Sequence, residues 1–295
     1  MSLKQHTSIY EQIDSLPSLP ATVSRVLSVT SDPESCGDDL VNAILPDQAM
    51  CAAILKIANS AFFGIPREVA TMDKAVNVLG FNEVHNIVLG KAVFNSFRKI
   101  PASSKRTVDA FWQHSFYCGL AAKVIAEDLK CPPSELFIAG LIHDIGKLAI
   151  FLTSPDEYLF ILDQESLACY VNSHEEEQKR LGSNHSLVGL RLLTRWMFPM
   201  QLLTMVGHHH QPEKCVNYAL YTTIIQISDL LSILVANEEE QTTDIYPQFT
   251  TLLPRGKALW EQLNLNINED KLQQWRQELL ASIEKDGAIL NIFTS

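Results

Sequence analysis

Apolar residues recur every three or four positions along most of this chain, the spacing that places them on one face of a helix. The stretch from Pro20 to Thr30 is typical, because Val23, Val26 and Leu27 share one face and a proline stands in the first turn. The same periodicity predicts helices over residues 38–45, 46–61, 72–79 and 82–97. No convincing alternation of apolar and polar residues, as in a half-buried strand, is present. The first hundred residues therefore predict a series of short helices.

The rest of the chain continues this pattern. Helices are predicted over residues 108–129, 135–152, 156–164, 174–181, 186–197, 199–210, 217–236 and 255–285. Two polar stretches, residues 99–107 and 238–243, are candidate boundaries. We therefore predict an all-α protein with an N-terminal helical subdomain (8–100), a second helical subdomain (101–237) and a C-terminal helical extension (238–295).

Composition and charge narrow the possible partners. The chain has 295 residues, of which 46% are hydrophobic and 19% charged, so it can bury a large core. Its net charge of −11 argues against binding to nucleic acid or to an anionic membrane, because both require a positive field. Only 12 residues are glycine, and no glycine-rich phosphate loop occurs. Without a basic cluster to select a large polyanion, any substrate should be small.

The cellular location of the protein is predicted from its apolar stretches, its N-terminal residues and its cysteines. The two longest, Leu136–Leu152 and Ile224–Val235, contain charged residues, so neither is expected to span a bilayer. The N-terminal residues lack the apolar core of a signal peptide, and the six cysteines form no CxxC pair. We predict a cytoplasmic protein.

The adjacent residues His143 and Asp144 are the sharpest candidate for chemistry. They fall in the middle of a strongly apolar predicted helix, where burying a charge is costly unless a partner compensates it. A divalent cation is one such partner, because carboxylate oxygen and imidazole nitrogen are ordinary metal ligands. The alternative is a core histidine that is hydrogen-bonded to a helix-capping aspartate. For an isolated His-Asp pair this alternative is the more common case.

Four other helical contexts contribute residues of the same kind: His114, His185, His209 with His210, and Asp229. Each has an ordinary structural explanation on its own, such as a half-buried core side chain or a helix end that favours a cationic imidazole. Their coincidence in one helical region is harder to explain structurally, and it favours a shared site.

In chain order, His114, His143-Asp144, His185, His209-His210 and Asp229 resemble the ligand series of the HD-superfamily metal-dependent phosphohydrolases. The first half of the chain adds three further segments, Leu16-Pro17-Ser18-Leu19-Pro20, Asn59-Ser60-Ala61-Phe62-Phe63-Gly64 and Ala75-Val76-Asn77-Val78-Leu79-Gly80. Together they resemble a more specific family, the HDOD domain, which is the HD-related output domain of bacterial signalling proteins. The similarity extends from about residue 10 to about residue 235 and leaves the last 60 residues uncovered.

The resemblance implies a multi-helical fold of two packed subdomains, the second of them HD-like. It also implies a regulatory role, because the family is regarded as regulatory and many members lack several metal ligands. This chain keeps a ligand-type residue at every position of the series. It differs from the related HD-GYP phosphodiesterases of cyclic di-GMP, since Gln211 stands where that group has glutamate and no Gly-Tyr-Pro follows. That difference argues against a cyclic dinucleotide as the substrate.

Two functions remain open. The first is a signal-transduction protein that acts by binding a small phosphorylated ligand or a signalling partner protein. The second is a phosphohydrolase that acts on a nucleotide or similar small phosphoester and holds one or two divalent ions of the iron or manganese type. We predict that the metal ligands are His114, His143, Asp144, His185, His209, His210 and Asp229, and that all seven converge on one pocket. In the enzyme, Asp144 would bridge the metals and Lys147 would neutralise a substrate phosphate, whereas the alternative for Lys147 is a solvated lysine near a helix end.

Overall fold

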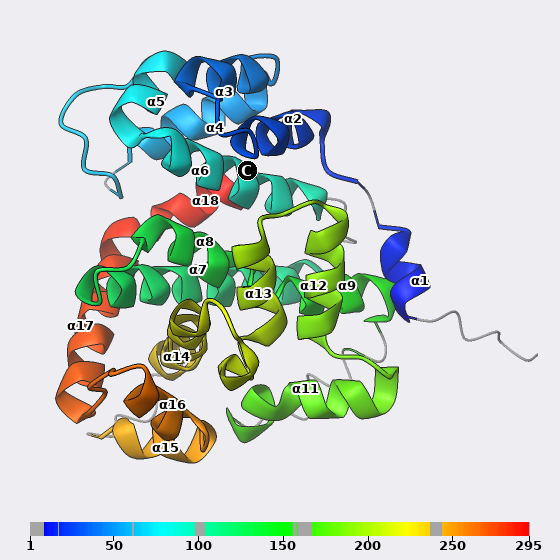
Figure 1. The fold of residues 1–295 in the computed structure, drawn as a ribbon, viewed down its shortest axis with the longest axis vertical. Helices are drawn as coiled ribbons and strands as arrows, with labels where there is room; N and C mark the ends of the chain where they lie inside the picture. Colours follow the sequence, from blue (N-terminus) through cyan, green and yellow to red (C-terminus); the bar gives the residue numbers. More distant parts are fainter. Residues whose placement is uncertain are drawn as a thin grey trace, which may run out of the picture. The chain divides into compact units, whose positions relative to one another are not determined.

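The structure of the chain is a computed structural model and describes residues 9–16, 18–60, 62–97, 104–155, 158, 167–236 and 244–294. Within these residues every regular element is a helix, which confirms the predicted all-α class (Figure 1). Contacts divide the chain into two compact units. The first contains Met1–Pro17, His143–Gln226 and Thr242–Asn268, and the second contains Ser18–Ile142, Ile227–Gln241 and Glu269–Ser295. Both units draw on all three predicted segments, so the boundaries 8–100, 101–237 and 238–295 stay a prediction.

The second unit begins with helices that follow the predicted periodicity. They are α2 (Ala21–Thr30), α3 (Gly37–Ile44), α4 (Gln48–Ala58), α5 (Met72–Leu79) and α6 (Phe81–Ser96). Asp47 caps α4 by accepting a hydrogen bond from the backbone N–H of Met50 (2.9 Å). Gly80, with φ = 95°, separates α5 from α6 in a conformation that other residues rarely adopt. Helix α6 packs against α2, α4 and α5 and forms the centre of this group.

Asn59, in one of the segments that resemble the HDOD domain, fixes the loop after α4. Its side-chain amide donates to the carbonyl oxygen of Val69 (2.8 Å), and its Oδ1 accepts from the Val69 backbone N–H (2.8 Å). Both polar groups of the side chain therefore bind the backbone ten residues further along the chain. Ala61, in the same segment, lies outside the described residues.

The second unit is completed by α7 (Lys105–Asp128), α8 (Pro133–Ile142), α17 (Glu269–Asp286) and α18 (Ala288–Thr294). Helices α7 and α8 approach closely at two glycines. A Cβ atom on Gly140 would lie 2.8 Å from the Cα of Gly119, and one on Gly119 would lie 2.8 Å from the carbonyl oxygen of Phe137. Helix α17 packs on α7, and α18 packs on α4, α6 and α7.

Lys91, on α6, holds the last helix in the second unit. Its side chain is buried (5% exposed), and its ammonium donates hydrogen bonds to the carbonyl oxygens of Ile292 (3.0 Å) and Phe293 (2.9 Å). Carbonyls in the last turn of a helix have no partner within the helix. The buried lysine therefore acts as a C-terminal cap for α18.

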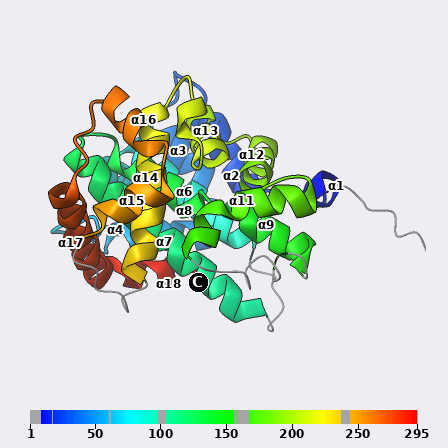
Figure 2. The ribbon, with the colours of Figure 1, turned by 90° about the horizontal axis from the view of Figure 1, so that it is seen from below.

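The first unit is built from shorter helices: α1 (Ile9–Asp14), α9 (Ile145–Thr153), α11 (Leu167–Leu181), α12 (His185–Arg195), α13 (Met200–His208), the 3₁₀ turn η2 (Pro212–Lys214), α15 (Tyr246–Leu252) and α16 (Gly256–Gln262). Helix α12 lies beside both α9 and α13 (Figure 1, Figure 2). Helix α14 (Ala219–Ala236) contributes its first half to this unit and its second half to the other. The predicted helix over 156–164 and the connection at 238–243 lie outside the described residues, apart from Tyr158.

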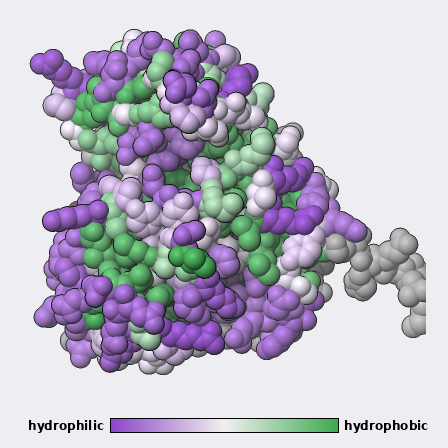
Figure 3. All heavy atoms as spheres, viewed as in Figure 1, coloured by the Kyte–Doolittle hydropathy of each residue, from purple (hydrophilic) through white to green (hydrophobic). Residues whose placement is uncertain are grey.

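Two stretches are long and apolar enough to cross a membrane by composition, Pro133–Thr153 and Ala219–Ala236. Of their most apolar windows, 89% and 72%, respectively, is buried inside the protein, as in core helices of a folded domain. The lower part of Figure 3, where α11 and α15 lie, is mainly hydrophilic, in agreement with the polar composition of the C-terminal extension.

Candidate metal centre

His143 and Asp144 interrupt the apolar stretch that the sequence predicts as one helix over 135–152. Helix α8 ends at Ile142 and α9 begins at Ile145, so the two residues form a turn between them. Asp144 occupies the N-cap of α9, and both residues are fully buried. The prediction of a continuous helix is wrong here. The turn, which the apolar pattern on both sides does not reveal, holds both polar side chains in the buried interior.

The two oxygens of the Asp144 carboxylate have different neighbours. Oδ1 lies 3.3 Å from His185 Nε2 and 3.5 Å from His209 Nε2. Oδ2 lies 2.7 Å from the ammonium of Lys147 and 3.3 Å from His143 Nε2. One oxygen thus faces imidazoles from α12 and the end of α13, and the other forms an ion pair. Lys147 is 5% exposed, so the alternative of a solvated lysine is wrong.

Glu177, on α11, fixes the protonation of His185. Its Oε2 lies 2.7 Å from His185 Nδ1 and also accepts a hydrogen bond from the His185 backbone N–H (2.6 Å). Because a carboxylate only accepts hydrogen bonds, Nδ1 donates to Glu177, and Nε2 is the nitrogen that faces Asp144. A carboxylate behind a histidine in this way is the usual support of a metal-ligating imidazole.

The same arrangement occurs at His209, with a backbone carbonyl in place of the carboxylate. His209 Nδ1 lies 2.8 Å from the carbonyl oxygen of Val206, which leaves Nε2 as the lone-pair nitrogen. Burial lowers the pKa of His209 to about 4, so this ring is neutral near neutral pH. His209 therefore presents a lone pair on the side of Asp144 Oδ1.

His210 brings a third imidazole to the group. Its Nε2 lies 2.9 Å from His185 Nε2, and its ring stacks on His174 with 4.9 Å between the ring centres. The Nε2 atoms of His185 and His209 are themselves 3.3 Å apart. Four side chains thus direct nitrogen or oxygen atoms to one point.

Glycines allow the helices that carry these side chains to approach. A Cβ atom on Gly146, in α9, would lie 1.9 Å from the carbonyl oxygen of His185. On the facing helix, a Cβ on Gly189 would lie 2.9 Å from a Val206 methyl group. This close packing of α12 on α9 brings His185 next to Asp144.

The electrostatics of the group favour an ionised carboxylate. Burial alone raises the pKa of Asp144, but the electrostatic influence of His143, Lys147 and His185 outweighs it and lowers that pKa well below 3.8. An ionised carboxylate oxygen then faces the Nε2 atoms of His185 and His209. Carboxylate oxygen and imidazole nitrogen are donor types that Zn²⁺, Mn²⁺ and Fe²⁺ accept.

The residues Asp144, His185, His209 and His210 could therefore hold a metal ion. Each offers one ligand atom, and the four atoms lie within 4.8 Å of one another. Metal–ligand bonds of about 2.0–2.2 Å fit such a spacing.

The remaining predicted ligands, His114 and Asp229, pair with each other in the second unit. His114 Nε2, on α7, lies 3.1 Å from Asp229 Oδ1 on α14, and His114 Nδ1 lies 3.3 Å from the Ser232 hydroxyl. The structure thus brings together His143, Asp144, His185, His209 and His210 in one unit and His114 with Asp229 in the other. Convergence of all seven on one pocket stays a prediction.

Sequence reasoning missed Glu177 and His174. Both lie on α11 in the polar run His174-Glu175-Glu176-Glu177, which is typical of a solvated helix face. One signal was available: Glu177 precedes His185 by eight residues, across a loop that contains Gly182, Ser183 and Asn184. That spacing allows the Glu177 side chain to contact His185 but does not predict the contact.

A family model for the HDOD domain matches residues 16–212 of this chain. A protein of Treponema pallidum (strain Nichols), described as uncharacterized, is 23% identical over 207 residues, which are 70% of this chain. The chain spans only 40% of the length of that relative.

Solved structures show the same fold over nearly the whole chain. One is a Shewanella amazonensis SB2B protein named "putative phosphohydrolase", with a TM-score of 0.72 and 21% identity over 98% of this chain and 99% of that one. Another is an HDOD domain protein of unknown function from Geobacter sulfurreducens, with a TM-score of 0.71 and 22% identity over 97% and 98%. At these identities the likeness establishes the fold and leaves the activity to be argued from the site.

Proposed function

Because the chain belongs to the HDOD domain family, we propose that it is a regulatory protein of signal transduction that binds a small phosphorylated ligand at a metal centre. One divalent ion is held by Asp144, His185, His209 and His210, with Glu177 orienting His185. The bound metal supplies a concentrated positive charge for an anionic ligand. Occupancy of the centre is then passed on to a signalling partner protein.

This proposal rests on the different neighbours of the two Asp144 carboxylate oxygens. Two-metal hydrolases stabilise the attacking and leaving oxygens with two ions about 3.5–4 Å apart, and Asp144 was predicted to bridge them. Here the Lys147 ammonium already lies 2.7 Å from Oδ2. A second cation at Oδ2 would meet a buried positive charge at contact distance, which is strongly unfavourable. The arrangement around Asp144 therefore supports one ion, bound on the Oδ1 side.

Hydrolysis of a phosphoester is the second candidate, and one observation favours it. His143 Nε2 lies 3.3 Å from Oδ2 and is a further ligand-type nitrogen on that side. If Lys147 left the carboxylate to meet a substrate phosphate, Oδ2 and His143 would be available for a second ion. In that enzyme the predicted set, including His114 and Asp229, would hold two metals.

Metal stoichiometry and turnover separate the two functions. We expect purified full-length protein loaded with Mn²⁺ to hold about one ion per chain by elemental analysis and to show no turnover of cyclic nucleotides or small phosphomonoesters. In Lys147→Met the second site is relieved of the competing charge, so a rise toward two ions per chain is expected. Two ions in the wild type, with turnover that Asp144→Ala abolishes, would establish the hydrolase instead.

A further inference from the structure

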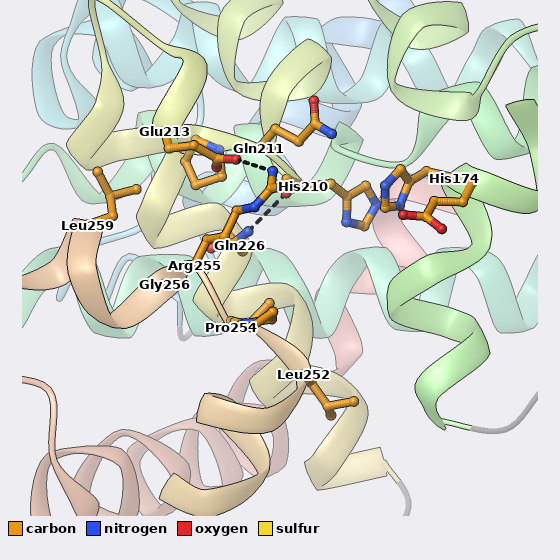
Figure 4. Close-up of a pocket in the computed structure, with 13 residues that line it drawn as sticks. His174, His210, Gln211, Glu213, Gln226, Leu252, Pro254, Arg255, Gly256 and Leu259 are labelled. Atoms are coloured by element: carbon orange, nitrogen blue, oxygen red, sulfur yellow. Dashed lines mark hydrogen bonds and ion pairs between the residues drawn. The ribbon is translucent and has the colours of Figure 1, made fainter.

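A cavity of about 220 Å³ lies in the first unit against His210, one of the four candidate metal ligands (Figure 4). It is bounded by the middle of α11, by the turn after α13 and by the segment that joins α15 to α16. Sites for drug-sized ligands measure roughly 300–1,000 Å³, and one water molecule takes about 30 Å³. The cavity is therefore too large for a single water and fits a small metabolite.

One wall of the cavity comes from outside the region that the family model matches. Leu252, Leu253, Pro254, Arg255, Gly256 and Leu259 all line it, whereas the HDOD match ends at residue 212. Four of these residues are apolar and can cover a carbon skeleton. The C-terminal extension, to which the family resemblance assigns no role, thus forms a wall of a cavity beside the metal centre.

Arg255 is the cation of that wall. Its side chain is 74% exposed and donates one hydrogen bond to Glu213 Oε1 (3.0 Å). A guanidinium carries five donors in a planar fork, so donors remain for the oxygens of a phosphate. Arg255 and a metal at His210 would provide positive charge at two sides of the cavity.

The other polar groups of the cavity call for hydrogen-bond donors on the ligand. Glu175 and Glu213 are carboxylates, and each repels a bare anion. Gln226 is 8% exposed, and its Nε2 donates to the carbonyl oxygen of His210 (3.3 Å), while its Oε1 is buried and has no hydrogen-bond partner within the described part of the chain. The terminal torsion of a glutamine is soft, so a small rotation brings this oxygen to a ligand hydroxyl.

We propose that this cavity binds a small hydroxylated phosphomonoester, with the phosphate at Arg255 and the metal side and the hydroxyls at Gln226 and the two carboxylates. Arg255 determines specificity, and the C-terminal extension thereby selects the ligand of the centre. The inference rests on the proposed function, because the metal at His210 supplies part of the charge that attracts the phosphate.

The test is a calorimetric titration of the full chain with ribose 5-phosphate, ribose and inorganic phosphate, each with Mn²⁺-loaded and with chelator-treated protein. We expect ribose 5-phosphate to bind at least tenfold more tightly than ribose or inorganic phosphate. Arg255→Ala should weaken its binding at least tenfold and leave the metal content unchanged. Lys257→Ala is the matched control, since Lys257 is an exposed cation two residues away that does not line the cavity.

The outcomes distinguish the two proposals. Normal metal content with no preference for ribose 5-phosphate, or with equal effects of Arg255→Ala and Lys257→Ala, would overturn the ligand cavity and leave the metal centre standing. Failure to bind Mn²⁺ would overturn the proposed metal centre. The titration of chelator-treated protein with ribose 5-phosphate would then test the proposed ligand cavity. Binding in that arm that depends on Arg255 supports the cavity, and absence of binding in both arms overturns it.

Discussion

Each unit of the protein buries a charged side chain, and the two are surrounded in different ways. In the second unit, the Lys91 ammonium can only donate hydrogen bonds, and it donates them to the carbonyl oxygens of Ile292 and Phe293, which can only accept. Asp144 in the first unit directs an acceptor oxygen at His209, whose facing nitrogen is also an acceptor. A donor that meets acceptors forms hydrogen bonds without any further group. Two acceptors that face each other need a cation or a proton between them.

The two buried charges therefore have different roles in the protein. A buried charge with matched partners stabilises the fold and has no need of a ligand, as Lys91 shows. Asp144 is paired with Lys147 through one oxygen and directs the other at imidazole nitrogens, so a cation that enters between them would stabilise the folded protein further. Substitution of either residue should therefore destabilise the protein, but only substitution of Asp144 should change the metal content.

The largest effect is expected for Asp144→Ala. Without the carboxylate the Lys147 ammonium and the imidazoles lose their common partner, so we expect loss of metal binding and destabilisation by about 3–5 kcal/mol. Elemental analysis and melting curves with and without chelator would measure both. A wild-type melting temperature that chelator leaves unchanged would contradict a metal-stabilised centre.

Lys91→Met should lower the free energy of unfolding by about 3 kcal/mol, because two charge-assisted hydrogen bonds disappear and two carbonyls at the end of α18 lose them. Its metal content should equal that of the wild type. Denaturant unfolding would measure the change, with Lys56→Met, an exposed lysine of the same unit, as the control. Loss of metal from Lys91→Met would break the contrast between the two buried charges.

Glu177→Gln should weaken metal affinity by about 10–100-fold, because the amide no longer fixes the protonation and orientation of His185 as a carboxylate does. The neighbouring Glu176, which pairs with Lys179 and Arg180 at the surface, offers the matched variant Glu176→Gln. Competition with a metal chelator of known affinity would compare the two. Equal effects of both variants would show that Glu177 has no specific role in the centre.

The smallest effect concerns pH and the second unit. Burial lowers the pKa of His85, on α6, to about 4 from 6.5, so between these values the unfolded chain binds a proton that the folded chain does not. His85 should therefore make stability fall by about 1 kcal/mol from pH 6.5 to 5.5, and His85→Gln should lose about 1 kcal/mol less than the wild type over this interval, while the loss that His209 causes in the same way remains. Denaturant unfolding of metal-free protein at the two pH values would test it, and equal slopes for both proteins would exclude His85 as the cause.

The helices were predictable because a single physical rule, the burial of one face, sets their periodicity. The break between α8 and α9 was not, since the apolar pattern continues on both sides of His143 and Asp144 and only the placement of two buried polar groups reveals the turn. His185, His209 and His210 could be chosen by residue type and order along the chain. Glu177 could not, because a carboxylate in a polar run has the same sequence signal whether it faces solvent or a buried imidazole.

The order of segments in the first unit has a consequence for synthesis of the protein. This unit contains α1, which begins at Ile9, and its last segment ends at Asn268. At about 5–20 residues per second, roughly 10–50 s pass between the appearance of these two ends on the ribosome. Throughout that interval α1 lacks its partners α9 and α12 or has met only part of its unit. The apolar side of α1 must therefore stay protected from aggregation while most of the chain is still being made, and a pause in translation after α6 would prolong this exposure.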